Sequence, residues 1–340
     1  MSASKALPGR VLMQRRYLLR PIAAAALTAG APWLASRAEG RFPGRPVRIV
    51  VPFAAGNTLD TALRQVAEVF VRNTGQPLII DAKPGGGGII AAQSVSKASP
   101  DGYTLLLAST SMLTVNPHTF DKLPYDPEKS YAPVTNFLGS SMVMAVNNKV
   151  PANDIKEFVA WAREHPGTVS FASFTAGNSS HFAGVLLNQR AGIDMIHVPF
   201  NGTPPAVSNL IGGQVDAAFL PLLAVKPHLD AGKVKVLAVT SPMRSPLMPD
   251  IATFNEQGYP DLEIYVWASV MAPSGTPDRI IGRLNDEFVR ALKSDEVREK
   301  WRTMDFEPLP STPTEFSRFA RRESARWAEA VKLSGFKADQ

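Results

Sequence analysis

RPVRIVVPFAAGNTLDTALRQVAEVFVRNTG, residues 45–75, sets the expected fold. Residues 47–53 are apolar and largely β-branched with a single charge, which predicts a strand covered on both faces. After Asp60, apolar residues recur at helical spacing over residues 61–73, and Gly75 supplies a left-handed end for that helix. A strand therefore leads through a turn of small residues into the start of a helix.

The turn at residues 53–60 presents backbone N–H groups at a helix start, an arrangement that binds anions readily. It contains no Lys, Arg or His. Because no Gly-Lys-Ser/Thr follows Gly56, the turn is not a nucleotide-binding P-loop. On these residues alone, a charge-free anion site and a tight turn that holds no anion both remain open.

The formal charge of the 340-residue chain, +6, comes from its first 38 residues. That segment has six of the 36 basic residues and no acid, so the remaining 30 basic residues balance 30 acidic ones. A balanced chain lacks the basic field that nucleic acids need, and we expect no nucleic-acid partner. With 45% hydrophobic residues, the chain can bury the cores of two domains.

Residues 1–38 read as an export signal. Basic residues precede a weakly hydrophobic stretch at 21–35, and small residues at 36 and 38 predict cleavage after Ala38. Arg15 and Arg16 resemble a twin-arginine motif, which leaves that route and the general secretory route both open. The chain has no cysteine, hence no lipid anchor and no disulfide. An uncleaved membrane anchor is the alternative to a free periplasmic product.

Strands and helices alternate from residue 46 to about 135, with strands predicted at 47–53, 77–81 and 103–108. A β-α-β-α-β order predicts a parallel sheet with right-handed crossovers. The first and third strands then end side by side at one sheet edge, where open α/β sheets bind ligands.

Two long apolar segments predict crossings between domains, one at 131–147 and a return at 265–272. Between them, strands expected at 169–172, 195–200, 217–220 and 234–239 repeat the first half's architecture. Helices at 277–292 and 313–333 close the chain. We predict one domain from residues 39–140 plus 248–340 and a second from 141–247, with polar turns of both facing one cleft.

Side chains for catalysis are sparse. None of the five histidines lies in a His-Glu-x-x-His pair, so no metal site and no cofactor are expected. Ser179 with His181 leaves an exported serine hydrolase as an alternative, although residues two apart at a helix start point in different directions. Gly86-x-Gly88-x-x-Ala91 matches a dinucleotide fingerprint only loosely, because it follows the second strand and lacks the acid about 20 residues on.

Many ordered motifs resemble one family, the substrate-binding proteins of tripartite tricarboxylate transporters, also called the Bug or TctC family. The resemblance covers residues 43–338. It rests on the motifs at residues 46–53, 84–88, 101–106, 116–118, 123–127, 197–202, 212–215, 237–241 and 272–277.

The resemblance implies a periplasmic two-domain α/β protein of the type II periplasmic-binding, or Venus-flytrap, fold. Such proteins bind small organic carboxylates and deliver them to membrane permease subunits. The resemblance further implies that backbone N–H groups, hydroxyls and water hold the ligand carboxylate at the loop after the first strand. This agrees with the charge-free anion site considered above.

The candidate ligand-binding residues are expected on turns of both domains. They are Phe53, Ala54, Ala55, Gly56, Asn57, Thr58, Asp60, Ser109, Thr110, Ser111, Thr175, Ala176, Gly177, Asn178, Ser179, Phe200, Asn201, Gly202, Thr203 and Leu220.

Some of these positions depart from the family pattern. Asn57, Ser111 and Thr175 stand where glycine is common. Leu220-Pro221 replaces a polar pair that often begins with Asp. The loss of that acid argues against recognition of an amino group, so we expect a non-amino carboxylate with an apolar or aromatic body.

We therefore predict a monomeric binding protein rather than an enzyme, closing by a hinge around a carboxylate. The sequence does not separate delivery to a transporter from presentation of the ligand to a signalling receptor ectodomain.

Overall fold

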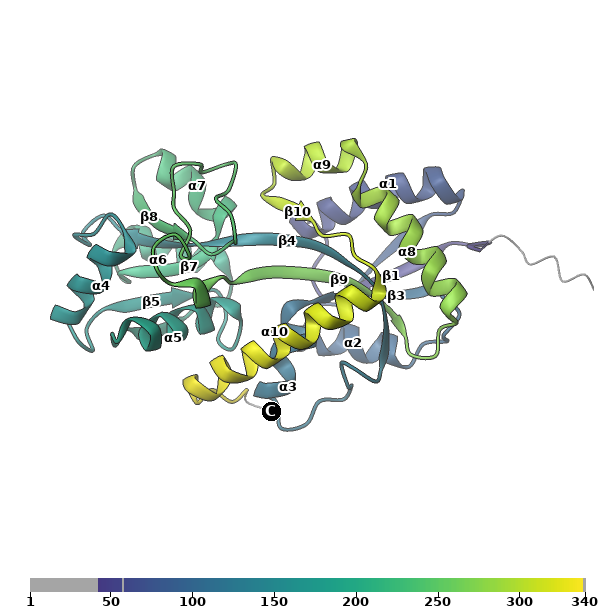
Figure 1. Ribbon diagram of the computed structural model, residues 1–340, viewed down its shortest axis with the longest axis horizontal. Coiled ribbons are helices and arrows are strands. Elements are labelled where there is room, and N and C mark those ends of the chain that lie inside the picture. Colours follow the sequence, from purple (N-terminus) through teal and green to yellow (C-terminus); the bar gives the residue numbers. More distant parts are fainter. Residues whose placement is uncertain (1–41, 57, 339–340) are drawn as a thin grey trace, which may run out of the picture. The chain divides into compact units, whose positions relative to one another are not determined.

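Ten strands form one sheet in the computed structural model, which describes residues 42–56 and 58–338 (Figure 1). The strand order is β2-β1-β3-β9-β4-β7-β5-β6, and β8 and β10 pair with β4 outside this path. The strands are β1 (Val47–Val51), β2 (Leu78–Ala82), β3 (Thr104–Ser109), β4 (Tyr131–Asn147), β5 (Ser170–Ser173), β6 (Ile196–Pro199), β7 (Ala217–Pro221), β8 (Val234–Val239), β9 (Tyr265–Pro273) and β10 (Phe306–Pro308).

Helices cover this sheet. They are α1 (Thr58–Thr74), α2 (Ile89–Ser96), α3 (Asn116–Thr119), α4 (Ile155–Glu164), α5 (Ser179–Ala191), α6 (Thr203–Gly212), α7 (Leu222–Asp230), α8 (Asp278–Leu292), α9 (Asp295–Arg302) and α10 (Pro313–Ser334). Single turns occur at η1 (Gly86–Gly88) and η3 (Pro260–Leu262), and η2 (Ser111–Val115) is a π-helical turn.

The predicted parallel unit is confirmed. Strand β1 pairs in parallel with β2 on one side and with β3 on the other. The predicted crossings are confirmed as well. The first part of β4 pairs antiparallel with β9, and Met142 to Asn147 continue into pairing with β7 and β8. One strand thus belongs to both halves of the sheet.

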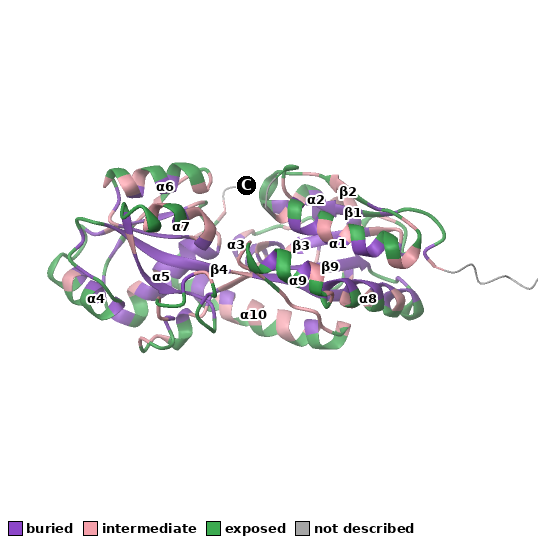
Figure 2. Ribbon diagram, turned by 90° about the horizontal axis from the view of Figure 1, so that it is seen from above, coloured by how far each residue is buried: buried purple, intermediate pink, exposed green. Residues whose placement is uncertain are grey.

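Buried residues gather around each half of the sheet (Figure 2). In the half with β1 and β3, Phe70, Phe137 and Trp301 belong to one core cluster. In the half with β5 and β7, Phe171 and Phe219 belong to another. The periodic apolar residues of the sequence are the ones that fill these cores, because helices and strands bury one face each.

The chain's end holds more structure than the two helices predicted there. Residues 295–302 form the additional helix α9, which begins where the Ser294 hydroxyl accepts the Val297 N–H. Helix α10 spans 22 residues and begins with a capping box of Thr312 and Glu315. The extra helix follows from a cap and an acidic first turn, a local signal that periodicity alone does not reveal.

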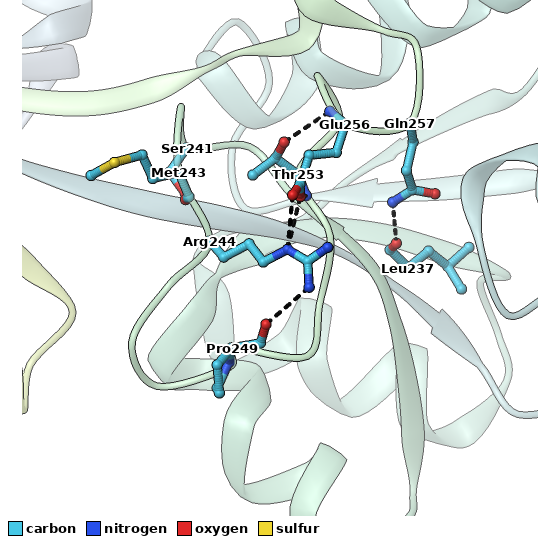
Figure 3. A network of polar contacts seen from close by, with 8 residues as sticks. All are labelled: Leu237, Ser241, Met243, Arg244, Pro249, Thr253, Glu256 and Gln257. Atoms are coloured by element: carbon cyan, nitrogen blue, oxygen red, sulfur yellow. Dashed lines mark hydrogen bonds and ion pairs between the residues drawn. The ribbon is translucent and has the colours of Figure 1, made fainter.

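The segment that links β8 to β9 is held by polar contacts rather than by strands (Figure 3). The Arg244 guanidinium donates to the Glu256 carboxylate at 2.9 Å and to the Pro249 carbonyl at 3.1 Å. The same carboxylate accepts the Thr253 N–H, and the Gln257 amide donates to a β8 carbonyl. These side-chain bonds add to the backbone hydrogen bonds of the loop, such as that from the Phe254 N–H to the Val239 carbonyl.

The predicted export signal, residues 1–38, lies outside the described residues. Within residues 42–56 and 58–338, no helix is long and apolar enough to cross a membrane.

Candidate functional site

A cavity of about 500 Å³ lies where β4 and β9 run between the two halves of the sheet. Its lining comes from both halves. The lining residues are Pro52, Phe53, Leu59, Leu107, Ser109, Leu138, Ser140, Ser141, Met142, Phe174, Thr203, Pro221, Leu223, Ala224, Val266, Trp267, Ala268, Met304 and Phe306. The volume lies within the range of ordinary small-molecule sites.

Strand register sets the floor of the cavity. Ser109 of β3 lies opposite Ala268 of β9, which in turn lies opposite Leu138 of β4. Two residues along, Val266 lies opposite Ser140. Because side chains alternate between faces with a period of two, these five residues share one face of the sheet.

The walls come from loops at strand ends. Phe53 and Leu59 lie on the loop and helix start after β1, and Met304 lies between α9 and β10. On the other side stand Phe174, after β5, and Thr203, the first residue of α6. Loops from both halves of the sheet thus contribute walls to the cavity.

The loop after β1 is held by its own acid. The Asp60 carboxylate, only 3% exposed, accepts the Gly56 N–H at 2.9 Å and the Arg64 Nε–H at 3.0 Å. The Gly56 bond, helped by the Arg64 guanidinium, holds the pKa of Asp60 below its usual value despite burial. Asp60 therefore organises this loop through the Gly56 amide that an external anion would otherwise use.

The other predicted residues of this loop differ in position. Phe53 lines the cavity, whereas Ala54 and Ala55 are exposed to solvent. Thr58 begins α1. Asn57 lies outside the described residues.

The residues of the turn after β3 have two roles: one lines the cavity and one holds the scaffold together. The side chain of Ser109 lines the cavity and accepts the Met112 N–H at 3.4 Å. Thr110 is 3% exposed, and its hydroxyl donates to the Trp267 carbonyl at 2.9 Å and accepts the Trp267 N–H at 2.8 Å. Thr110 thereby fixes the end of β3 to β9, while Ser111 starts η2.

The turn after β5 serves the start of α5 rather than the cavity. The Asn178 side chain caps that helix by accepting the N–H groups of Ser180 and His181. Ser179 is 4% exposed, and Thr175 donates to the Phe174 carbonyl. Of this turn, Phe174 lines the cavity, and the predicted residues 175–179 lie outside the lining.

Gly177 and Ala176 complete this turn. Ala176 is exposed to solvent. Gly177 has φ +74°, and a Cβ there would lie 2.3 Å from the ring of Phe336. The end of the chain therefore covers this turn, and only glycine fits beneath it.

The turn after β6 is joined to the turn after β5. The Gly202 N–H donates to the Phe174 carbonyl at 2.8 Å, and the Phe200 N–H donates to the Ser173 carbonyl at 2.9 Å. Asn201 is exposed. Thr203 is the residue of this turn that reaches the cavity.

Leu220 of β7 is fully buried in a core cluster, and its neighbour Pro221, the last residue of β7, lines the cavity. The substitution of the polar pair noted in the sequence therefore places apolar atoms at this wall.

Ser179 and His181 are engaged in other contacts. Nδ1 of His181 accepts the Gly177 N–H at 3.2 Å, and its ring stacks on His197 with centroids 3.8 Å apart. Burial lowers the pKa of both histidines to about 4. These partners leave His181 poorly suited to activate Ser179, because a general base needs a free ring nitrogen within reach of the hydroxyl.

Several lining residues lie outside the set predicted from the sequence. Met304 and Phe306 flank Asp305, whose φ of +51° turns the chain between α9 and β10. Ser140 interrupts the apolar run of β4, a signal that was available. Leu223 and Ala224 reach the cavity from the first turn of α7. Within the described part of the chain, no group of three His, Cys, Asp or Glu is placed to hold a metal ion.

Comparison with known proteins places this architecture in a family. Residues 62–336 match the family model described as "Tripartite tricarboxylate transporter family receptor", TctC. Protein BugT of Bordetella pertussis (strain Tohama I) is 33% identical over 297 residues, covering 87% of this chain and 91% of BugT.

Two solved structures give the same result. The structure of R. palustris Rpa4515 with adipate has a TM-score of 0.76 and 31% identity, covering 87% of this chain and 99% of that one. MatC from Rhodopseudomonas palustris with bound malate has a TM-score of 0.71 and 32% identity, covering 85% of this chain and 100% of MatC.

The fold is thus the two-domain α/β fold of periplasmic binding proteins, as predicted. The chain belongs to the TctC family of tripartite tricarboxylate transporter receptors, whose members include Bug proteins. That family consists of solute-binding proteins, which are not enzymes.

Proposed function

We propose that the protein is exported to the periplasm, captures a small organic carboxylate in the cavity, and delivers it unchanged to a tripartite tricarboxylate-type permease. One observation carries the proposal. The cavity lies between strand-end loops of both halves, is large enough for a small metabolite, and presents hydroxyls without ionisable side chains. Hydroxyls and backbone dipoles can hold a carboxylate without the cost of desolvating a counter-ion.

The binding motion follows from the crossings. The proposed domains, residues 39–140 plus 248–340 and residues 141–247, meet along β4 and β9, whose middle parts floor the cavity. Bending of these strands would bring the loops at Phe53 and Ser109 toward Thr203. These are the predicted site residues that share the lining.

A thermal-shift screen against organic acids tests this function. A ligand at a hundredfold excess over its Kd should stabilise the protein by about 2.7 kcal/mol. Ser109→Ala should weaken the affinity roughly tenfold or more, since a bond to a charged group is lost. Ser208→Ala on the exposed side of α6 is the matched control. A screen in which no acid stabilises the protein, or equal effects of the two variants, would contradict the proposal.

Two further measurements ask whether the ligand stays chemically unchanged and whether a tripartite permease receives it. Mass spectrometry of the ligand recovered after incubation should show it unchanged, and a hydrolysed product would favour the enzyme alternative. Uptake of the identified acid by vesicles that contain a tripartite permease should require added protein.

A further inference from the structure

The cavity is poor in groups that could hold a second charge. Four of its lining residues carry a hydroxyl, namely Ser109, Ser140, Ser141 and Thr203. The others are apolar except Trp267, whose indole N–H donates to the Glu323 carboxylate. One carboxylate offers about four acceptor positions to hydrogen-bond donors, and two carboxylates offer about eight. The side-chain donors therefore suffice for at most a single carboxylate.

The hydroxyls are not all aimed at a ligand. The amide and the hydroxyl of Ser141 hydrogen-bond to the carboxyl group of Asp305. Burial raises the pKa of Asp305, and these hydrogen bonds offset part of that rise. Ser245 donates to the same carboxyl group at 2.7 Å. Fewer hydroxyl groups are therefore free to donate to a ligand than the lining contains.

Acidic groups stand behind one wall. Asp305 lies between Met304 and Phe306, which both line the cavity. Glu307 follows directly and accepts the Tyr265 hydroxyl at 2.6 Å. A second carboxylate that reached this wall would meet apolar side chains first and like charge beyond them, and both disfavour it.

We propose that the ligand is an organic acid with one carboxylate and an apolar body, aliphatic or aromatic, an inference that rests on the proposed carboxylate function. The carboxylate is held by the hydroxyls of the floor and of Thr203. The body lies against the apolar walls formed by Phe53, Leu223 and Met304. This preference distinguishes the chain from the two relatives whose structures contain the diacids adipate and malate.

Isothermal titration calorimetry with matched acids tests the inference. Hexanoate and adipate have six carbons each and differ in one carboxylate; benzoate and terephthalate form an aromatic pair. We expect the monoacid of at least one pair to bind about 100-fold or more tightly than its diacid, because an unpaired buried charge is costly. Diacids that bind as tightly as the monoacids overturn the inference but leave carboxylate binding intact. If no acid of either pair binds, both the inference and the proposed function fail.

A charge placed in the wall should reverse the preference. Met304→Lys should raise the affinity for adipate relative to hexanoate at least about tenfold by supplying a counter-charge. Met243→Lys adds the same charge at a side chain that is 69% exposed and outside the cavity, so the ratio of its affinities for adipate and hexanoate should not change. If Met304→Lys does not give a cooperative thermal transition, Leu223→Lys replaces it. An unchanged ratio in the folded cavity variant would count against the inference.

Discussion

The stacked pair of His181 and His197 makes the stability of the fold depend on pH. His181 is 6% exposed, and its Nδ1 accepts the Gly177 N–H. Ser173 Oγ donates to the Thr175 carbonyl and lies 2.7 Å from His197 Nε2. Since a hydroxyl has one hydrogen, His197 Nε2–H must be the donor in that contact. His181 is therefore neutral with its proton on Nε2, because its Nδ1 accepts a hydrogen bond, and the lowered pKa of His197 keeps that ring neutral at pH 7 as well.

The sign and size of the effect follow from the pKa values. Burial lowers the pKa of each ring to about 4, and the partner ring adds to this at His181. An unfolded histidine titrates near pH 6.5, so between pH 6.5 and 4 the unfolded chain binds more protons. Stability is then retained at pH 7 and lost as pH falls. At pH 5 the loss is about 2 kcal/mol for one ring, and at most about twice that for the pair.

Among the other shifted groups, His118 acts in the same direction, because burial lowers its pKa, whereas the shifted carboxyl groups act outside this window or against it. The lowered pKa of Asp60 places its loss of stability below about pH 4. The raised pKa of Asp305 adds stability as pH falls, and so reduces the net loss.

Urea unfolding at pH 7 and pH 5 measures the effect. The protein should lose about 2 to 4 kcal/mol of unfolding free energy over this interval, and His197→Gln should lose about half as much. His165→Gln changes an exposed histidine and should keep the full loss. If His197→Gln and the unmodified protein lose the same free energy, the reasoning about the stacked pair is refuted.

Three further predictions concern the hinge and the first loop. Gly139→Ala should destabilise the fold by about 1 to 3 kcal/mol, because the new Cβ would lie 1.9 Å from the Tyr265 ring. In a double-mutant cycle, adding Tyr265→Ala should remove part of that cost, because it removes the ring. Asp60→Ala removes the acceptor for the Gly56 N–H, so thermal melts should show a loss of stability of about 1 to 3 kcal/mol, and ligand binding should weaken. From its place in the sequence, Asn57→Asp should weaken acid binding by like charge; unchanged affinity in calorimetry would remove Asn57 from the site.

The sequence supports the arrangement of strands because its signals there are periodic and local. Residues 47–51 form most of the strand predicted at 47–53, and the apolar run 131–147 forms the predicted crossing over its full length. A buried parallel strand and a crossing strand both require unbroken apolar stretches, and few other elements of similar length have them. Strand order across the sheet then follows from short connections.

The residues of the candidate site were harder to predict, because polar turn residues of one type can either line a cavity or hydrogen-bond to the protein's own backbone. Ser109 and Thr110 are adjacent hydroxyls after the same strand, yet one lines the cavity and the other binds the backbone of Trp267. Asn178 resembles a ligand group and caps α5. Met304 comes from a distant segment that only tertiary contacts bring to the cavity. Side-chain direction and long-range packing decide these cases, and neither is written in local composition.

The cavity and helix α10 lie on opposite faces of strand β9, and this would constrain the closing motion proposed above. On β9, Val266 and Ala268 face the cavity, while the Trp267 ring packs on Phe316 of α10 at 5.7 Å. Farther along α10, Trp327 belongs to the core of the other half of the sheet. One rigid helix therefore packs into both cores behind the floor. If the cavity closes as proposed, the motion would pivot on that side, and the loops of the cavity would travel farther than the residues beneath them.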